Sequence, residues 1–94
     1  MKAKKITLFQ ALLMIKNTRE MEAFFKDLCT PQELQDLHDR WEVCQLLAQE
    51  DLSYLEIYAL TGISLTTIGR VARFLNQEPH KGYRTVLNRF DTKS

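Results

Sequence analysis

The stretch Ser53–Leu75, SYLEIYALTGISLTTIGRVARFL, decides the fold of this 94-residue chain. Ser53 followed three residues later by Glu56 is the pattern of a helix-capping box, which predicts a helix that begins at the next residue. Gly62 stands where that helix would end in a left-handed residue, a conformation that glycine adopts without steric cost. Ser64 can cap a following helix. The stretch therefore predicts two short helices joined by a tight turn.

The apolar residues of this stretch fall at helical spacing on one face of each expected helix. The expected inner residues are Ile57, Leu60 and Thr61 in the first helix, Ile63 at the corner, and Ile68, Val71 and Leu75 in the second helix. Helix, glycine turn, apolar plug and second helix are typical of a helix-turn-helix, whose second helix fits the DNA major groove. An ordinary helical hairpin within an all-α core is the alternative interpretation.

The second helix is expected to carry an exposed polar face. Thr66, Thr67, Arg70 and Arg73 lie on that face. Arginine can pair bidentately with guanine, and threonine can meet base edges or methyl groups. We therefore expect these four residues to contact DNA, with backbone amides near Ser64 seating a phosphate. A solvated face or pairing within the helix would produce the same pattern.

The charge distribution supports this assignment more than the net charge does. The chain carries 13 Lys and Arg against 12 Asp and Glu, for a net charge of +1. Residues 53–94 hold six basic and three acidic side chains, so the half with the helix-turn-helix is net positive. That polarity suits the phosphate backbone of a duplex.

Composition and capping patterns predict an all-α domain of about six helices. The chain has three glycines and two prolines, and no alternating run of strand length. Asn17 with Glu20 and Thr30 with Glu33 are expected capping boxes; the second opens a long scaffold helix at Pro31. A loop with Pro79 and Gly82, a last helix over 83–90 and a tail over 91–94 complete the expected chain.

Other functional classes find little support. Cys29, Cys44, His38 and His80 lack the spacing of a metal site, so we expect no metal. No nucleophile with a base and an orienting group can be assembled, which argues against an enzyme. The apolar runs are too short to span a membrane, and nothing looks like a targeting segment, so we expect a cytoplasmic protein.

The run LCTPQELQDLHDRWEVCQLLAQEDLSYLEIYALTGISLTTIGRVARFLN, residues 28–76, resembles the Trp-repressor-like proteins, most closely their YerC/YecD branch. The resemblance extends over residues 24–90. It implies an intertwined, all-helical homodimer that binds double-stranded DNA and regulates transcription. Within a single domain over 1–94, residues 1–52 would form the dimerisation scaffold, 53–75 the helix-turn-helix, and 76–94 a loop and C-terminal helix.

The same resemblance implies DNA-contacting and effector-binding positions. By similarity Leu65, Thr66 and Gly69 face the bases. In members of the family that bind tryptophan, two arginines sandwich the indole; Arg40 and Arg70 match these arginines, and Thr30 and Thr67 match two polar contacts nearby. Val71 and Phe74 replace a glycine and a serine of those members. We therefore expect no cofactor, with Trp41 or Phe74 filling the space. An aromatic amino-acid corepressor, or another small-molecule effector sensed through the Arg40–Arg70 pocket, is kept as the ligand-sensor alternative.

The first helix of the motif leaves two interpretations open. Tyr54, Leu55 and Tyr58 stand where the repressor offers polar and basic groups to phosphates. Tyrosine hydroxyls can touch phosphate without contributing charge. The same three side chains could instead form a protein-binding surface, which would make the chain an interaction module that retains the helix-turn-helix shape.

Overall fold

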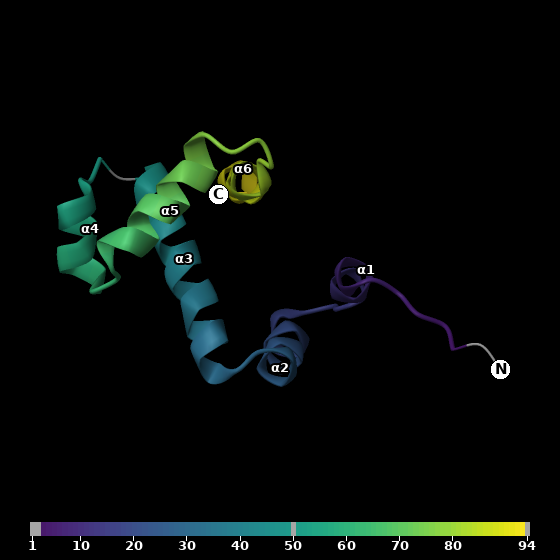
Figure 1. Ribbon diagram of the computed structural model, residues 1–94. Coiled ribbons are helices and arrows are strands. Elements are labelled where there is room, and N and C mark those ends of the chain that lie inside the picture. The colour runs from purple at the N-terminus through teal and green to yellow at the C-terminus, as the bar shows by residue number, and fades with distance from the viewer. Residues whose placement is uncertain (1–2, 50, 94) are drawn as a thin grey trace. The chain divides into compact units, whose positions relative to one another are not determined.

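The computed structural model describes residues 3–49 and 51–93 of the chain, with side chains as far as Asp91. The described residues form six α-helices and no strand, which confirms the all-α prediction (Figure 1). The helices are α1 (Leu8–Leu13), α2 (Thr18–Leu28), α3 (Pro31–Gln49), α4 (Tyr54–Thr61), α5 (Leu65–Asn76) and α6 (Gly82–Lys93).

The chain divides into two compact units. The first ends at Gln35 and the second begins at Asp36, so the division falls inside α3. This division rests on packing. The functional division expected after residue 52 is not tested by it and stays a prediction.

The first unit contains α1, α2 and the beginning of α3, and neither α1 nor α2 holds a buried residue. Phe9 is 75% exposed and Leu13 is 87% exposed. The described part of the chain does not bury these two apolar side chains. Their exposure leaves a large apolar surface facing solvent in this unit.

Side chains cap the helices of the first unit and the start of α3. At α2 the Asn17 side chain accepts a hydrogen bond from the Glu20 amide, but the Glu20 carboxylate accepts from the Lys16 amide rather than from Asn17. The expected reciprocal box is therefore wrong in its second half. The Thr30 and Glu33 box is present, with both hydrogen bonds at 2.8 and 3.1 Å.

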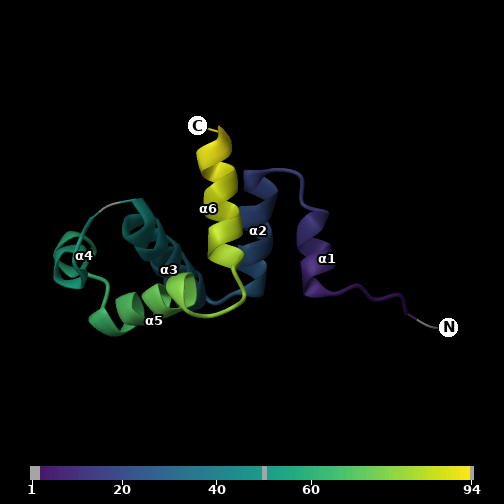
Figure 2. The ribbon, with the colours of Figure 1, turned by 90° about the horizontal axis from the view of Figure 1, so that it is seen from above.

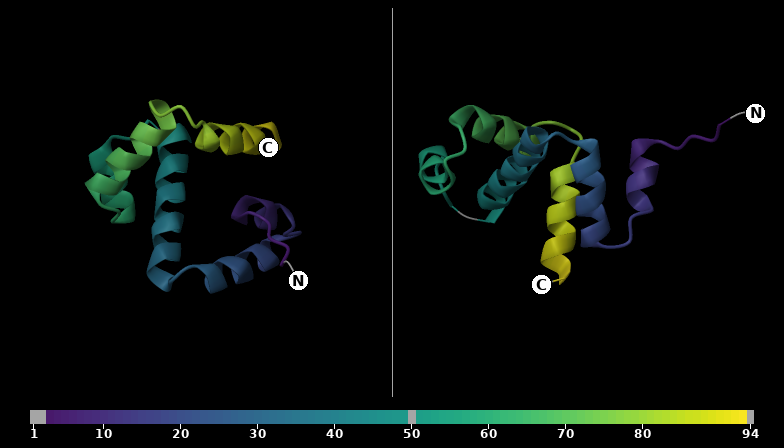
Figure 3. Two further views of the ribbon diagram at one scale, coloured as in Figure 1. Left: turned by 45° about the vertical axis from the view of Figure 1, so that its right-hand side comes forward. Right: turned by 90° about the horizontal axis from the view of Figure 1, so that it is seen from below.

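The second unit packs around α5. Figures 1 and 3 show α5 lying against the C-terminal part of α3, with α4 and α6 before and after it in the chain. Burying a large apolar side chain stabilises a fold by about 1.5–3 kcal/mol, so this cluster holds the unit together. The buried members are Val43, Cys44, Ile57, Ile63, Ile68, Val71, Leu75 and Leu87, and Trp41, Leu46, Leu47, Leu52 and Tyr83 pack against them.

The α5–α6 corner is fixed by an arginine. Arg84 donates from Nε to the Leu75 carbonyl at 3.2 Å and from an η nitrogen to the Asn76 side-chain oxygen at 2.7 Å. These bonds satisfy groups at the end of α5 that have no partner within the helix. Figure 2 shows the link that leads from α5 to α6. Lys81, the last residue of that link, has φ 61°.

Three local expectations differ from the structure. Leu60 is 68% exposed, so it does not belong to the inner face of α4. Gly82 is the first residue of α6 rather than part of the loop, and α6 runs to Lys93, through most of the expected tail. Glu50, in the expected break after the scaffold helix, and Met1, Lys2 and Ser94 lie outside the described residues.

Candidate nucleic-acid interface

The turn between α4 and α5 has the predicted glycine geometry. Gly62 adopts φ 74° and ψ 2°, and its amide donates to the Tyr58 carbonyl at 2.8 Å. The Thr61 hydroxyl donates to the Ile57 carbonyl at 2.8 Å and accepts from the Ile63 amide at 3.1 Å. The side chain of Thr61 thus continues the hydrogen bonding where the helix stops, which sets the direction in which α5 leaves the turn.

Serine caps begin both helices of the motif. Ser53 and Glu56 form the complete capping box expected from the sequence. Hydrogen bonds from Ser53 lower the pKa of the Glu56 carboxyl from its ordinary value of 4.5. At α5 the Ser64 hydroxyl accepts from the Thr67 amide at 3.2 Å and donates to the Thr67 hydroxyl at 3.0 Å. Ser64 and Thr67 therefore organise the start of α5, whatever else they contact.

Helix α5 has two different faces. One face is anchored in the core by Ile68, Val71, Ala72 and Leu75, which are at most 5% exposed. The predicted DNA-contacting residues lie on the other side: Leu65 is 44% exposed, Thr66 and Arg70 are exposed, and the Arg73 side chain is 60% exposed. Gly69 lies between them with nothing within 4 Å of a Cβ built on it. The structure brings these residues to one accessible face, and their role in DNA binding stays a prediction.

Two arginines of this face converge on one aromatic ring. The Arg70 guanidinium carbon lies 4.4 Å from the centroid of Phe74, and that of Arg73 lies 5.1 Å from it. The imidazole of His80 stacks on Phe74, with centroids 6.1 Å apart and planes at 10°. Arg73 also forms an ion pair with Glu78, at 3.7 Å between Nε and a carboxylate oxygen.

The residues expected to bind an effector are partly assembled. Burial, with a smaller effect of Cys44, raises the pKa of Tyr83, and Arg40 and Arg70 both lie close enough to its phenol to oppose that rise electrostatically. The Tyr83 ring lies against Trp41, with centroids 6.4 Å apart. Phe74, one of the two residues expected to fill the space, lies against Arg70.

Thr30, the fourth residue of the expected effector site, belongs to the first unit. Its hydroxyl is engaged by the Glu33 amide at the start of α3. Thr67 is likewise engaged, in its case by Ser64. Both threonines therefore have a structural role at a helix cap.

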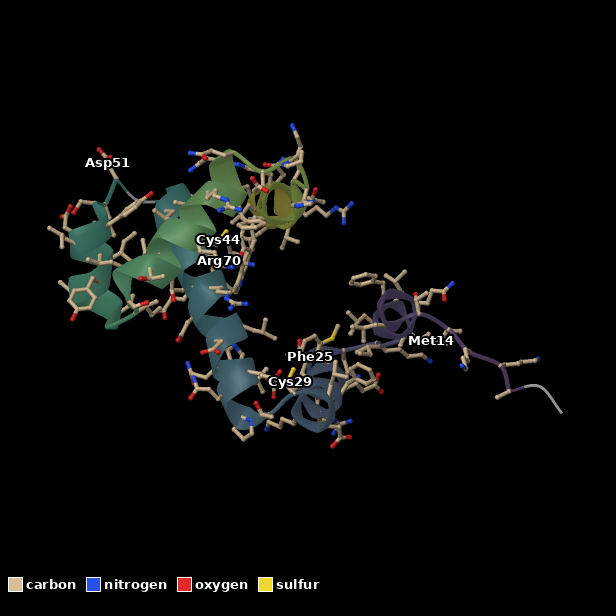
Figure 4. All side chains as sticks on the ribbon, in the orientation of Figure 1. Met14, Phe25, Cys29, Cys44, Asp51 and Arg70 are labelled. Carbon is tan, nitrogen blue, oxygen red and sulfur yellow. The ribbon has the colours of Figure 1, made fainter. Side chains whose placement is uncertain are left out.

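The two thiols and the acidic residues that the structure describes form no metal-binding cluster. Within residues 3–49 and 51–93, no group of three or more His, Cys, Asp and Glu side chains lies close enough together to hold an ion. Cys44 is fully buried in the core, and burial raises the pKa of its thiol from 9.0 to about 11, against a smaller opposing effect of Arg84. Figure 4 labels Cys44, on α3, and Arg70, on α5, close together in the second unit.

Helix α4 presents an exposed apolar surface. Tyr54 is 45% exposed, Leu55 67% and Tyr58 50%. The one charged residue of α4, Glu56, has its carboxylate bonded to the Ser53 amide at 2.9 Å. This surface therefore offers hydroxyl groups and apolar area, and its role as a phosphate contact or a protein contact stays open.

Three side chains matter to this interface in ways that sequence reasoning missed. The Arg70–Phe74 contact had a signal, since residues four apart on a helix face each other. Glu78 lies beyond the end of α5, and its ion pair with Arg73 depends on how the chain turns there. Arg84 was counted with the basic residues available to DNA, but it binds the end of α5.

The protein is all-helical and carries a helix-turn-helix. The serine caps, the glycine turn and the two different faces of α5 together define this motif. None of its described helices combines the length and apolar character that a membrane crossing requires. The sequence profile of the Trp repressor protein family matches residues 4–91. The chain therefore belongs to the Trp repressor family, whose members are regulatory DNA-binding proteins.

Two relatives identify the branch. The chain is 42% identical over 82 residues to the "Uncharacterized protein YerC" of Bacillus subtilis strain 168, an alignment that covers 87% of this chain and 77% of the relative. Its fold matches the crystal structure of a TrpR-like protein from Eubacterium eligens ATCC 27750 with a TM-score of 0.81 and 42% identity. That match covers 89% of this chain and 84% of the other. These likenesses place the chain in the YerC branch, as the sequence predicted.

Proposed function

We propose that the protein is a sequence-specific, DNA-binding transcriptional regulator that inserts α5 into the major groove. The observation that carries the proposal is the division of α5 into a face anchored by Ile68 and Val71 and an accessible face with Arg70 and Arg73. A helix held by one side can enter a groove with the other. Arginine supplies both the charge that phosphates attract and the paired donors that guanine accepts.

We propose further that the protein acts as a homodimer. The support is the apolar surface of the first unit, where α1 and α2 bury none of their residues. A chain that folds with such surface gains stability when a second copy covers it. Two copies would present two α5 helices to successive major grooves, about 34 Å apart. Sedimentation across a dilution series tests this, and a monomer at every concentration refutes it.

Selection from a random-sequence duplex pool on the purified protein tests the DNA-binding proposal. We expect recovery of a sequence with two related half-sites. A salt series on the recovered duplex then separates charged contacts from others: Arg73→Ala reduces the salt slope by about one unit if Arg73 meets phosphate. Arg89→Ala, which removes an exposed arginine outside the helix-turn-helix, is the matched control. Failure to recover any preferred sequence contradicts the proposal.

The second candidate function is a protein-interaction module. The exposure of Tyr54, Leu55 and Tyr58 favours it, since tyrosine is enriched among the residues that dominate protein-binding surfaces. Replacing these three residues with serine separates the two functions. Loss of a protein partner with DNA affinity intact supports the module, and loss of DNA affinity in a folded protein supports the regulator.

We also propose that DNA binding requires no aromatic amino-acid corepressor. Phe74 lies against Arg70, and the phenol of Tyr83 lies within the electrostatic reach of Arg40 and Arg70. The chain thus supplies its own rings beside both arginines. Calorimetric titration with tryptophan and indole is expected to give no binding heat, and saturable binding of either would restore the ligand-sensor alternative.

A further inference from the structure

The arginine platform, defined as Phe74 with Arg70 and Arg73 above its ring, combines three side chains of one helix. The two guanidinium carbons lie 4.4 and 5.1 Å from the ring centroid, within the range of a cation–π interaction. His80 stacks on the same ring and so limits the positions that Phe74 can take. The platform is half-buried at Phe74 and exposed at both arginines.

A guanidinium that lies over a ring keeps its hydrogen-bonding edge free. Its N–H donors point outward in the guanidinium plane, so stacking does not consume them. Stacking does restrict the rotamers of a long side chain that would otherwise lose its freedom only on binding. Prior restriction of this kind raises affinity without any new contact to the ligand.

Arg73 has a restraint besides the Phe74 ring, so Arg70 reports more directly on the effect of the ring. The Glu78 carboxylate lies 3.7 Å from Nε of Arg73, and the Glu78 amide donates to the Arg73 carbonyl at 3.1 Å. The backbone bond places Glu78 beside the end of α5, and the ion pair would hold the Arg73 side chain there even without the ring. A change confined to the ring should therefore act more strongly through Arg70.

We propose that Phe74 is a positioning residue that holds Arg70 and Arg73 in the orientation in which they meet DNA. The inference rests on the proposed function of α5 as the DNA-reading helix. Phe74 touches neither base nor phosphate in this mechanism. It acts through the two arginines.

Graded fluorination of the Phe74 ring in the full-length protein tests the proposal. Fluorine withdraws electron density from the ring face and leaves its shape nearly unchanged, so the cation–π attraction weakens while packing stays the same. Dissociation constants are measured on the duplex recovered by selection across a salt series, and the variants are compared with one another at one fixed salt concentration. We expect affinity to fall stepwise with the number of fluorines, by about 2–5-fold in total for each reading helix. The salt slope stays constant because no charge is removed.

Two comparisons make the result specific. The same fluorination of Phe90, a 54% exposed ring on α6, is expected to leave affinity unchanged. Phe74→Leu lowers affinity like full fluorination, and Phe74→Trp, which offers the strongest ring for a cation, restores it. Urea unfolding of each variant reports folding stability separately.

The possible outcomes are distinct. Affinity that is flat across the fluorination series, or that rises with it, overturns the inference. A loss of affinity that follows a loss of folding stability also overturns it, because it assigns Phe74 a packing role. An unmodified protein that binds no duplex overturns the proposed function and the inference with it, whereas DNA binding that ignores fluorination overturns the inference alone.

Discussion

Replacing Gly62 with alanine tests the geometry of the turn on which the interface depends. Gly62 has φ 74°, and a Cβ built on it meets nothing within 4 Å. Steric clash with neighbours therefore contributes nothing, and the cost is the left-handed backbone conformation itself. That conformation costs an L-residue about 1–2 kcal/mol. We expect Gly62→Ala to lower the free energy of unfolding by this amount.

Gly69 provides a matched control on the next helix. It too has open space around a built Cβ, but it lies inside α5 and is not among the positive-φ residues of the described chain. Alanine at a helical glycine stabilises by about 0.5–1 kcal/mol. The same substitution is thus expected to have opposite signs at two positions seven residues apart. Gly69→Ala should also weaken DNA binding if the open space above it admits a base.

The assay is unfolding of both variants and the parent protein by urea and by heat, each monitored by circular dichroism at one protein concentration, since association shifts apparent stability. For a chain of this size, each kcal/mol corresponds to about 4–8 °C in melting temperature. Gly62→Ala should melt below the parent and Gly69→Ala above it. A Gly62→Ala protein as stable as the parent would falsify the left-handed turn and with it the orientation assigned to α5.

Three further predictions concern the core and the titrating groups. In urea unfolding, Ile68→Ala, at a fully buried position, should lower the free energy of unfolding by about 2–5 kcal/mol. Leu60→Ala, at an exposed position, should change it by no more than about 0.5 kcal/mol. Similar changes for the two variants would contradict the assigned burial. Because burial raises the pKa of Cys44, its thiol contributes about 2–3 kcal/mol to the free energy of unfolding, fully below pH 9, and this contribution is lost as the pH rises toward 11. The melting temperature of Cys44→Ala should therefore fall less between pH 9 and pH 11 than that of the parent. The lowered pKa of Glu56 contributes stability above pH 4.5 that is lost as pH falls through its folded pKa. The melting temperature of Glu56→Gln should therefore depend less on acid pH than that of the parent. Parallel acid profiles of the two proteins would contradict a stabilising role for the Ser53–Glu56 capping bond.

Local signals in the sequence were sufficient for the helix-turn-helix. Ser53, Glu56, Gly62 and Ser64 act through hydrogen bonds and backbone angles within four residues of themselves, so their roles could be predicted without knowing the rest of the fold. The long helix from Pro31 was predicted on the same grounds. These predictions are confirmed because capping chemistry is local.

The errors arose where a residue's environment depends on distant parts of the chain. Leu60 matches helical spacing, yet its side chain is 68% exposed among the described residues. Spacing indicates that residues share a face, but it does not indicate whether another element packs on that face. The Glu20 carboxylate accepts a hydrogen bond from the Lys16 amide rather than from the Asn17 amide because the chain bends before α2. Composition does not predict that bend.

The exposure of the candidate site residues on α5 was predicted, but their contacts were not, and their role in DNA binding stays a prediction. The sequence placed Thr66, Arg70 and Arg73 on one side of α5, and the structure agrees. It did not show that Phe74 lies under both arginines or that Glu78 pairs with Arg73. Those contacts depend on rotamers and on the path of the chain after α5, which periodicity leaves undetermined.

The separation of α5 into an anchored face and an accessible face has an evolutionary consequence. Leu65, Thr66 and Arg70 are exposed, and the core holds the helix through other residues. Under the proposed DNA-binding function, exchanges at these three positions are expected to alter target preference at little cost to folding stability. A library randomised there would remain mostly folded, so this scaffold can diverge toward new operators by few steps, in nature or by directed reprogramming.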